Sequence, residues 1–148
     1  MYGLNPYKTP HFLHFIEMIP KALSMEQFLL ISIGSILGAN LRYWLGDWVA
    51  HRWSSSFPIG TFFINISGSF LLGLFITLAM ERFGLDPRWR LLVAVGFLGA
   101  YTTFSTYTFD SINLIFNGQW PLGIFNLFGS SILGGLAVLL GVVIGRKF

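Results

Sequence analysis

Phe57–Met80 decides the fold: this stretch reads FPIGTFFINISGSFLLGLFITLAM and contains no charged side chain. A helix crosses the hydrocarbon core of a bilayer with roughly 20 consecutive apolar residues. The stretch has that length and that composition. It is therefore predicted to span a membrane as one helix, over about residues 58–80.

The rest of the chain repeats this pattern. Leu91–Phe109 is uncharged, and so is Ser111–Gly145, which is far too long for a single crossing. The polar cluster Asn117–Pro121 is a turn signal that divides the longer run. Gln27–Trp48 carries charge only near its end. We therefore predict an all-α integral membrane protein with four transmembrane helices, at about 26–49, 58–80, 89–117 and 121–145.

Composition supports this class and excludes others. The chain of 148 residues is 54% hydrophobic and only 10% charged, whereas a soluble domain carries about a quarter charged residues. It has no cysteine, which excludes disulfides, iron–sulfur clusters and thiolate zinc sites. Its nine Lys and Arg residues are dispersed at helix ends, so nucleic acid is not expected as a partner. No carboxylate pair, Ser/His/Asp set or phosphate-binding loop is found, and we expect no enzyme.

Two regions are distinguished along the chain. Residues 1–24 form an N-terminal tail, interpreted as either an interfacial segment or a disordered one, and residues 25–148 form the transmembrane domain. Four spans place both tails and the 81–90 connection on one side of the membrane. That side holds seven cations against two on the other side, or five against two without the tail, which predicts cytoplasmic tails. The seven are Lys8, Lys21, Arg82, Arg88, Arg90, Arg146 and Lys147, and the two are Arg42 and Arg52.

Small residues recur at helical spacing. Gly34 and Gly38 form a GxxxG pair, as do Gly141 and Gly145. Such faces allow helices to approach closely in lipid. They are interpreted either as packing within this chain's own bundle or as a contact between two copies. Because four helices alone enclose little protected space, a pore would need a second copy.

The third span contains an unusual polar segment. Gly99 and the β-branched pair Thr102 and Thr103 weaken the helix there, and carbonyls freed by a break commonly bind a cation such as Na⁺. Tyr101, Phe104 and Tyr107 follow at intervals of three, which in a helix places them on one face. That stripe serves either packing or anion binding, since aromatic ring edges carry positive partial charge.

Three other polar residues lie within the predicted spans. Asn65 lies in the middle of the second span and needs a hydrogen-bond partner in hydrocarbon, or water. Arg42, near the end of the first span, is expected to extend toward the interface. Asp110, at the far end of the third span, is interpreted as an interfacial carboxylate.

At these residues the chain resembles the CrcB/Fluc family of fluoride channels, over about residues 27–145. The motifs that carry the resemblance are GANLRY at Gly38–Tyr43, GTFFIN at Gly60–Asn65, GFLG at Gly96–Gly99 and TTFST at Thr102–Thr106. The resemblance implies a third helix broken in mid-membrane and a dual-topology dimer, whose two oppositely inserted subunits enclose two narrow fluoride pores. It also implies a structural Na⁺ at the dimer centre, held by the backbone carbonyls of Gly99 and Thr102.

The resemblance further assigns residues to the pore. Fluoride would pass Asn65, Phe104, Tyr107, Thr103, Thr106 and Ser131, with Asp110 and Arg42 at the pore mouth. Tyr107 stands where the family has a second phenylalanine, and Asp110 where it often has a glutamate. In the family, a row of hydroxyl side chains, here called the hydroxyl track, follows one face of the fourth helix. Ser131 matches it, whereas the neighbouring positions along that face are Leu127 and Gly135, which have no hydroxyl.

The excess of Lys and Arg on one side of the membrane conflicts with insertion in both orientations, because such an excess favours one orientation. Either the tail before Met25 is not native, or the fold overrides the bias, or the partner is a related chain with the opposite bias. The leading hypothesis is passive export of fluoride through the inner (plasma) membrane. The alternatives are a small proton-coupled exporter, which normally needs an acidic residue deep in a span, and a non-transporting assembly subunit.

Overall fold

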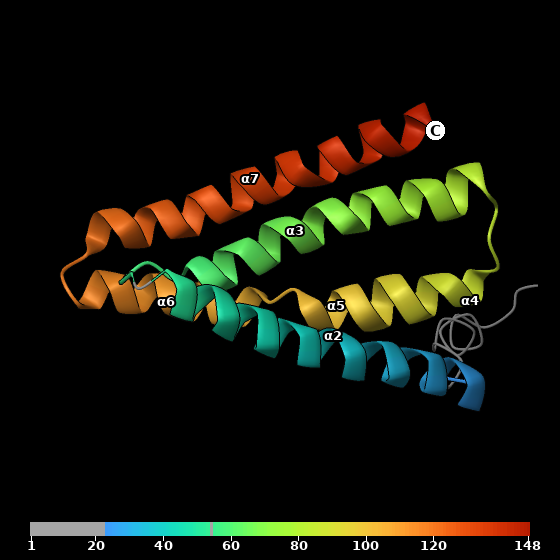
Figure 1. Ribbon diagram of the computed structural model, residues 1–148, viewed down its shortest axis with the longest axis horizontal. Helices are drawn as coiled ribbons and strands as arrows, with labels where there is room; N and C mark the ends of the chain where they lie inside the picture. The colour runs from blue at the N-terminus through green and yellow to red at the C-terminus, as the bar shows by residue number, and fades with distance from the viewer. Residues whose placement is uncertain (1–22, 54) are drawn as a thin grey trace, which may run out of the picture.

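The computed structural model describes residues 23–53 and 55–148, and that part of the chain is built of helices (Figure 1). Its elements are α2 (Met25–Arg52), α3 (Ile59–Ile76), η1 (Thr77–Arg82), α4 (Pro87–Trp89), η2 (Arg90–Leu98), α5 (Gly99–Tyr101), α6 (Phe104–Phe116) and α7 (Trp120–Lys147).

These elements form four helices long and apolar enough to cross a membrane, so the chain is a multi-pass membrane protein. The spans are Met25–Arg52, Ile59–Arg82, Pro87–Phe116 and Trp120–Lys147. All eight ends lie within three residues of the predicted ones. The predicted tail, residues 1–24, lies outside the described residues except for Leu23 and Ser24.

Short polar signals set the helix ends. Ser24 caps α2 in a reciprocal capping box with Gln27. Asp86 accepts a hydrogen bond from the Arg88 N–H at the start of α4, with Pro87 in the first turn. Gly118 has a φ of +76° in the turn before α7, a conformation that L side chains rarely adopt.

The helices pack as two pairs, shown in Figure 1. α7 lies along α3, and α2 lies along η2 and α5. The pairs come together where α6 packs on α7 and diverge toward the opposite end, where η1 and α4 lie. The segment between α5 and α6 lies between these two ends of the bundle.

Glycines bring the helices of each pair into backbone contact. A Cβ atom at Gly34 or Gly38 would overlap the carbonyl oxygen of Leu92 or Phe97 in η2. A Cβ atom at Gly141 would likewise overlap the Phe70 carbonyl oxygen in α3. Both GxxxG faces therefore pack this chain's own bundle.

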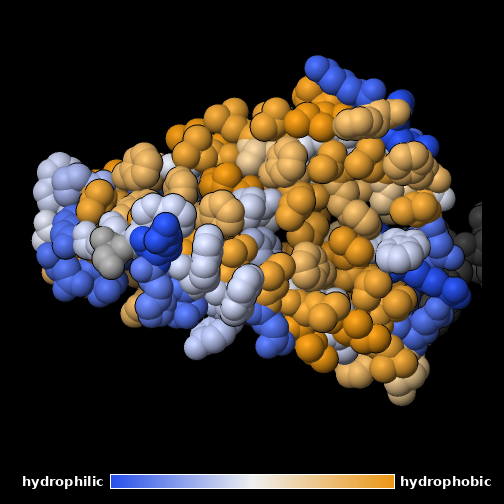
Figure 2. Space-filling model, viewed as in Figure 1, coloured by the Kyte–Doolittle hydropathy of each residue, from blue (hydrophilic) through white to orange (hydrophobic). Residues whose placement is uncertain are grey.

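The outer surface suits hydrocarbon rather than water. Figure 2 shows hydrophobic residues over the body of the molecule, while hydrophilic residues gather at the two ends of its long axis. Large apolar side chains such as Phe28, Leu139 and Phe128 are exposed. Lipid tails solvate such side chains, so most of the apolar surface need not be buried within the bundle.

We predict that Gly38→Ala lowers the free energy of unfolding by roughly 1–3 kcal/mol, because the added methyl group would push α2 away from the Phe97 carbonyl. Gly135→Ala is the matched control, since nothing lies within 4 Å of its added Cβ. The control should change stability by less than about 1 kcal/mol. Denaturant unfolding in detergent, followed by circular dichroism, measures both. Equal effects would contradict the packing described here.

Candidate functional site

The third span is not helical at Thr102 and Thr103. α5 ends at Tyr101, and Thr102 has φ −79° and ψ 156°. Thr103 has φ −145° and ψ 122°, and α6 begins at Phe104. Thr103 also acts as the N-cap of α6, because its Oγ1 accepts a hydrogen bond of 3.3 Å from the Thr106 N–H. The chain is thus extended over two residues near the middle of the span.

Asn65 of α3 pairs with both backbone polar groups of Thr103. Its Nδ2 donates to the Thr103 carbonyl oxygen at 3.0 Å, and its Oδ1 accepts from the Thr103 N–H at 2.8 Å. Backbone groups that leave a helix inside a membrane need partners within the protein. One side chain supplies both, so Asn65 bridges α3 to the interruption.

These hydrogen bonds release two carbonyls from the helical pattern. In a continuous α-helix the Thr103 N–H would donate to the Gly99 carbonyl, and the Thr106 N–H to the Thr102 carbonyl. Instead, the two N–H groups donate to Asn65 Oδ1 and Thr103 Oγ1. The freed carbonyls belong to Gly99 and Thr102, the residues that the resemblance assigns to Na⁺.

A cavity of about 410 Å³ opens beside the interruption. The second, third and fourth spans all contribute to its lining. Seven of the residues singled out from the sequence line it, namely Asn65, Gly99, Thr102, Thr103, Phe104, Tyr107 and Ser131. Gly135, one of the two positions without a hydroxyl on that face of the fourth helix, also lines the cavity. Residues far apart in the sequence thus meet around one space.

The two aromatic rings in this cavity differ in exposure. Phe104 is 75% exposed, whereas Tyr107 is only 9% exposed. Their rings meet edge to face, with centroids 5.2 Å apart and planes at 77°. The Tyr107 hydroxyl lies 3.5 Å from Ser131 Oγ on α7. Tyr107 is therefore held within the bundle, and Phe104 projects from it.

The prediction that three aromatic side chains share one helix face is wrong for Tyr101. Its ring stacks on Phe97, and its hydroxyl lies 3.0 Å from Ser67 Oγ. Tyr101 is buried and does not line the cavity with Phe104 and Tyr107. The physical reason is the interruption itself: residues three apart share a face only where the helix between them is continuous.

Thr106 and Arg42 line a second cavity, of about 470 Å³, between α2 and α3. Thr103 lines both cavities and so lies between them. Arg42 is partly buried here rather than fully exposed at the end of its span.

Asp110 lies beyond the second cavity. Its Oδ2 accepts a hydrogen bond of 3.0 Å from Thr61 Oγ1, and Thr61 lines the second cavity. Asp110 itself lines a small polar cavity of about 150 Å³. Thr61, which was not among the predicted site residues, thus links Asp110 to the lining of the second cavity.

A buried polar cluster between α6 and α7 did not emerge from the sequence. Asn126 and Ser111 are both 0% exposed. Asn126 Nδ2 donates to Ser111 Oγ at 2.9 Å and to the Tyr107 carbonyl at 3.3 Å, while Ser130 Oγ donates to Asn126 Oδ1 at 3.2 Å. The cluster fixes the part of α6 that carries Tyr107. Its signal was an asparagine within an apolar span, the same signal that singled out Asn65.

The chain matches known proteins over most of its length. The family model described as CrcB-like protein, Camphor Resistance (CrcB), matches residues 29–142. A protein of Koribacter versatilis (strain Ellin345), named fluoride-specific ion channel FluC, is 46% identical over 117 residues, which are 79% of this chain and 93% of the relative.

Two further relatives carry the same name. The protein of Trichormus variabilis is 48% identical over 117 residues, 78% of this chain and 85% of the relative. The protein of Chloroflexus aurantiacus (strain J-10-fl) is 42% identical over 124 residues, 84% of this chain and 98% of the relative.

We predict that Asn65→Ala lowers the free energy of unfolding by about 1–3 kcal/mol, because the N–H and carbonyl of Thr103 lose their partner. Asn113→Ala on the exposed side of α6 is the control and should stay within about 0.5 kcal/mol. Denaturant unfolding in detergent compares the two variants. An equal, small effect of both would show that Asn65 does not hold the interruption.

Proposed function

This chain belongs to the CrcB family, and on that premise we propose that it is a fluoride-selective ion channel rather than an enzyme. One observation carries the proposal: pore residues assigned from the second, third and fourth spans line one cavity beside the non-helical segment Thr102–Thr103. The relatives named as fluoride-specific ion channels support it.

The biological task is passive export across the inner (plasma) membrane. Hydrogen fluoride enters as a neutral weak acid, ionises in a more alkaline cytoplasm and is trapped there as the anion. A channel allows the anion to leave down its gradient. This task requires neither nucleotide hydrolysis nor a proton-binding carboxylate deep in a span.

Neutral groups hold fluoride weakly along the path. The ring edges of Phe104 and Tyr107 carry positive partial charge. The Thr106 hydroxyl and the second N–H of the Asn65 amide supply donors. The hydroxyls of Thr103 and Ser131 donate to Thr106 Oγ1 and the Leu127 carbonyl, and would turn toward the anion as it passes. Weak stations in series suit conduction, because an ion bound too tightly would not leave. Arg42 and Asp110 stand toward the mouth: Arg42 lines the second cavity and Asp110 the small one, and neither lines the first.

Two chains complete the pores. Phe104 is 75% exposed in the single chain, and its ring borders the first cavity. A second copy, or a related chain, inserted in the opposite orientation would cover this face and enclose two pores. The interruption would then lie in mid-membrane at the dimer centre.

A structural Na⁺ fits the oxygen atoms available there. The carbonyls of Gly99 and Thr102 are freed from helical hydrogen bonding because their usual donors are turned to Asn65 and Thr103. Freed backbone carbonyls of broken membrane helices commonly coordinate Na⁺. The same two residues from each chain would hold the ion. The ion would thus link the two subunits at the dimer centre.

The proposal predicts rapid fluoride release from liposomes that contain the purified protein, with a K⁺ ionophore present to dissipate the voltage. A fluoride electrode follows the release, and a chloride electrode follows a parallel chloride-loaded sample. Release of fluoride without chloride is expected. No fluoride release from well-assembled protein would remove the proposal, and proton-driven release alone would favour the exporter.

Phe104→Ile should reduce the fluoride flux by roughly tenfold or more while the oligomer size stays unchanged, because an aliphatic side chain lacks the polarised ring edge. Phe109→Ile is the matched control: Phe109 is similarly exposed, at 70%, on the same helix, and lines neither cavity. Its flux should remain normal. If Phe104→Ile instead abolishes assembly, the ring serves packing, as expected of an assembly subunit.

A further inference from the structure

An apolar groove lies between the second and third spans, on a different face from the polar cavity. Its volume is about 350 Å³, and its lining includes Leu74, Leu78, Phe83, Val93 and Phe97. Leu74 and Leu78 are one turn apart and so share a face of the second span. The second-span residues that line the first cavity are others, namely Asn65, Gly68, Ser69 and Leu72, although Leu98 of the third span lines both spaces. The groove is therefore a separate feature from the proposed pore.

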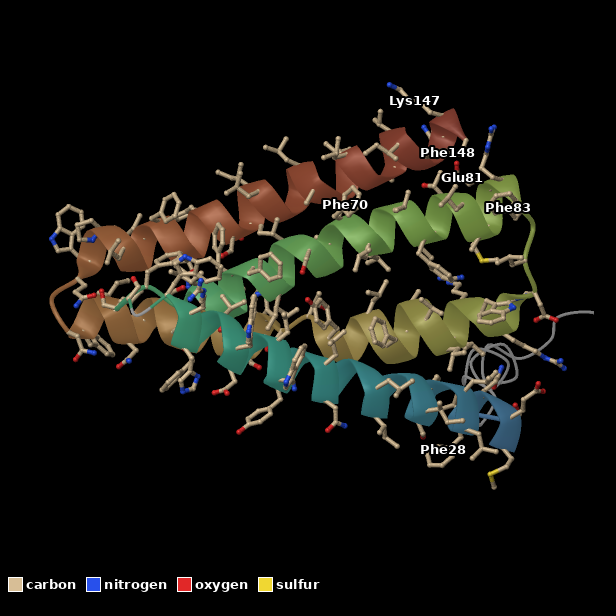
Figure 3. The ribbon with its side chains drawn as sticks, viewed as in Figure 1. Phe28, Phe70, Glu81, Phe83, Lys147 and Phe148 are labelled. Atoms are coloured by element: carbon tan, nitrogen blue, oxygen red, sulfur yellow. The ribbon has the colours of Figure 1, made fainter. Side chains whose placement is uncertain are left out.

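The groove reaches the membrane surface at the 82–90 connection. Phe83, in that connection, is one of its lining residues, and Figure 3 shows this side chain where η1 gives way to the connection. Trp89 nearby is half-exposed, at 49%. Tryptophan is enriched at the level of the lipid headgroups. The groove thus runs from headgroup level into the hydrocarbon region.

Two exposed arginines lie close in sequence to the residues that line this end of the groove. Arg82 directly precedes Phe83, and Arg90 begins η2 three residues before Val93. In the described part of the chain, neither lies within 4 Å of a carboxylate.

The other two arginines near this end of the bundle have carboxylate partners. Arg88 pairs with Glu26 at 2.7 Å, and Arg146 pairs with Glu81 at 3.2 Å. Among the described residues, Arg82 and Arg90 are therefore the two arginines at this end that have no carboxylate partner.

We propose that this groove binds an anionic phospholipid, with one acyl chain between the two spans and the phosphate between Arg82 and Arg90. Basic sites between transmembrane helices bind anionic headgroups in this way. The lining favours an acyl chain over a protein helix. Close helix contacts use small residues, whereas bulky side chains such as Leu74 and Phe97 line the groove, and a flexible chain can follow their uneven surface.

The test measures binding of phosphatidylglycerol to the detergent-solubilised protein by native mass spectrometry, with phosphatidylcholine of the same acyl chains as the neutral comparison. The wild-type protein should retain phosphatidylglycerol preferentially. The double variant Arg82→Gln/Arg90→Gln should bind it about 30-fold more weakly, since each cation contributes about fivefold. Leu74→Trp, which fills the groove, should also weaken binding.

Arg52→Gln is the matched control, because Arg52 is an exposed arginine at the opposite end of the first span. Its phosphatidylglycerol binding should be unchanged. Equal retention of the two lipids, or equal losses in the Arg52 and Arg82/Arg90 variants, would overturn the proposal. So would a change of oligomer mass with Leu74→Trp, because a second copy would then cover the groove. The readout does not require ion flux, so its outcome is independent of the channel proposal.

Discussion

The structure depends on how one backbone unit is satisfied inside a membrane. Thr103 leaves the helix and carries an N–H and a carbonyl that lipid cannot serve, because hydrocarbon offers no hydrogen-bond partner. Asn65 serves both, and its amide is the right shape because it offers one donor and one acceptor side by side. A serine or an aspartate in its place would lack the amide's matched donor and acceptor. The interruption is therefore a specified feature and not a weak point of the helix.

The glycines place the helices close enough for this bridge. Gly68 lies one turn after Asn65, and a Cβ atom there would overlap the Thr102 side chain. On the other side of the third span, Gly34 and Gly38 allow α2 to approach η2 at backbone distance. Close packing before and at the interruption fixes the position of the two extended residues. The freed carbonyls of Gly99 and Thr102 are then held in place without a long side chain.

Much of the architecture was accessible from the sequence because the bilayer imposes it. Uncharged runs of sufficient length predict spans, and turn residues such as Gly118 and Pro121 separate them. The glycine pairs were ambiguous, since spacing shows that a face is small but not which helix covers it. Tyr101 was misplaced because helical spacing was carried across a segment that is not helical.

Long-range partners explain the remaining differences. Asn65 was singled out from the sequence, yet nothing in a single span indicates that its partner is the backbone 38 residues later. Asn126 was overlooked although it is completely buried, because its partners Ser111 and Tyr107 lie on another helix. A polar residue in a span signals that a partner exists, but tertiary packing determines which one.

Tyr107 stands where the resemblance places a second phenylalanine of the proposed pore. Compared with phenylalanine, tyrosine adds a hydroxyl, and here that hydroxyl lies 3.5 Å from Ser131 Oγ at the edge of the cavity. The added group is uncharged and has a polar neighbour, so it brings no ionised ligand into the first cavity. The ring also remains edge to face with Phe104. In the proposed channel, a tyrosine at this position would keep a ring edge with positive partial charge and would add one hydroxyl group. Both are uncharged groups that would bind an anion weakly.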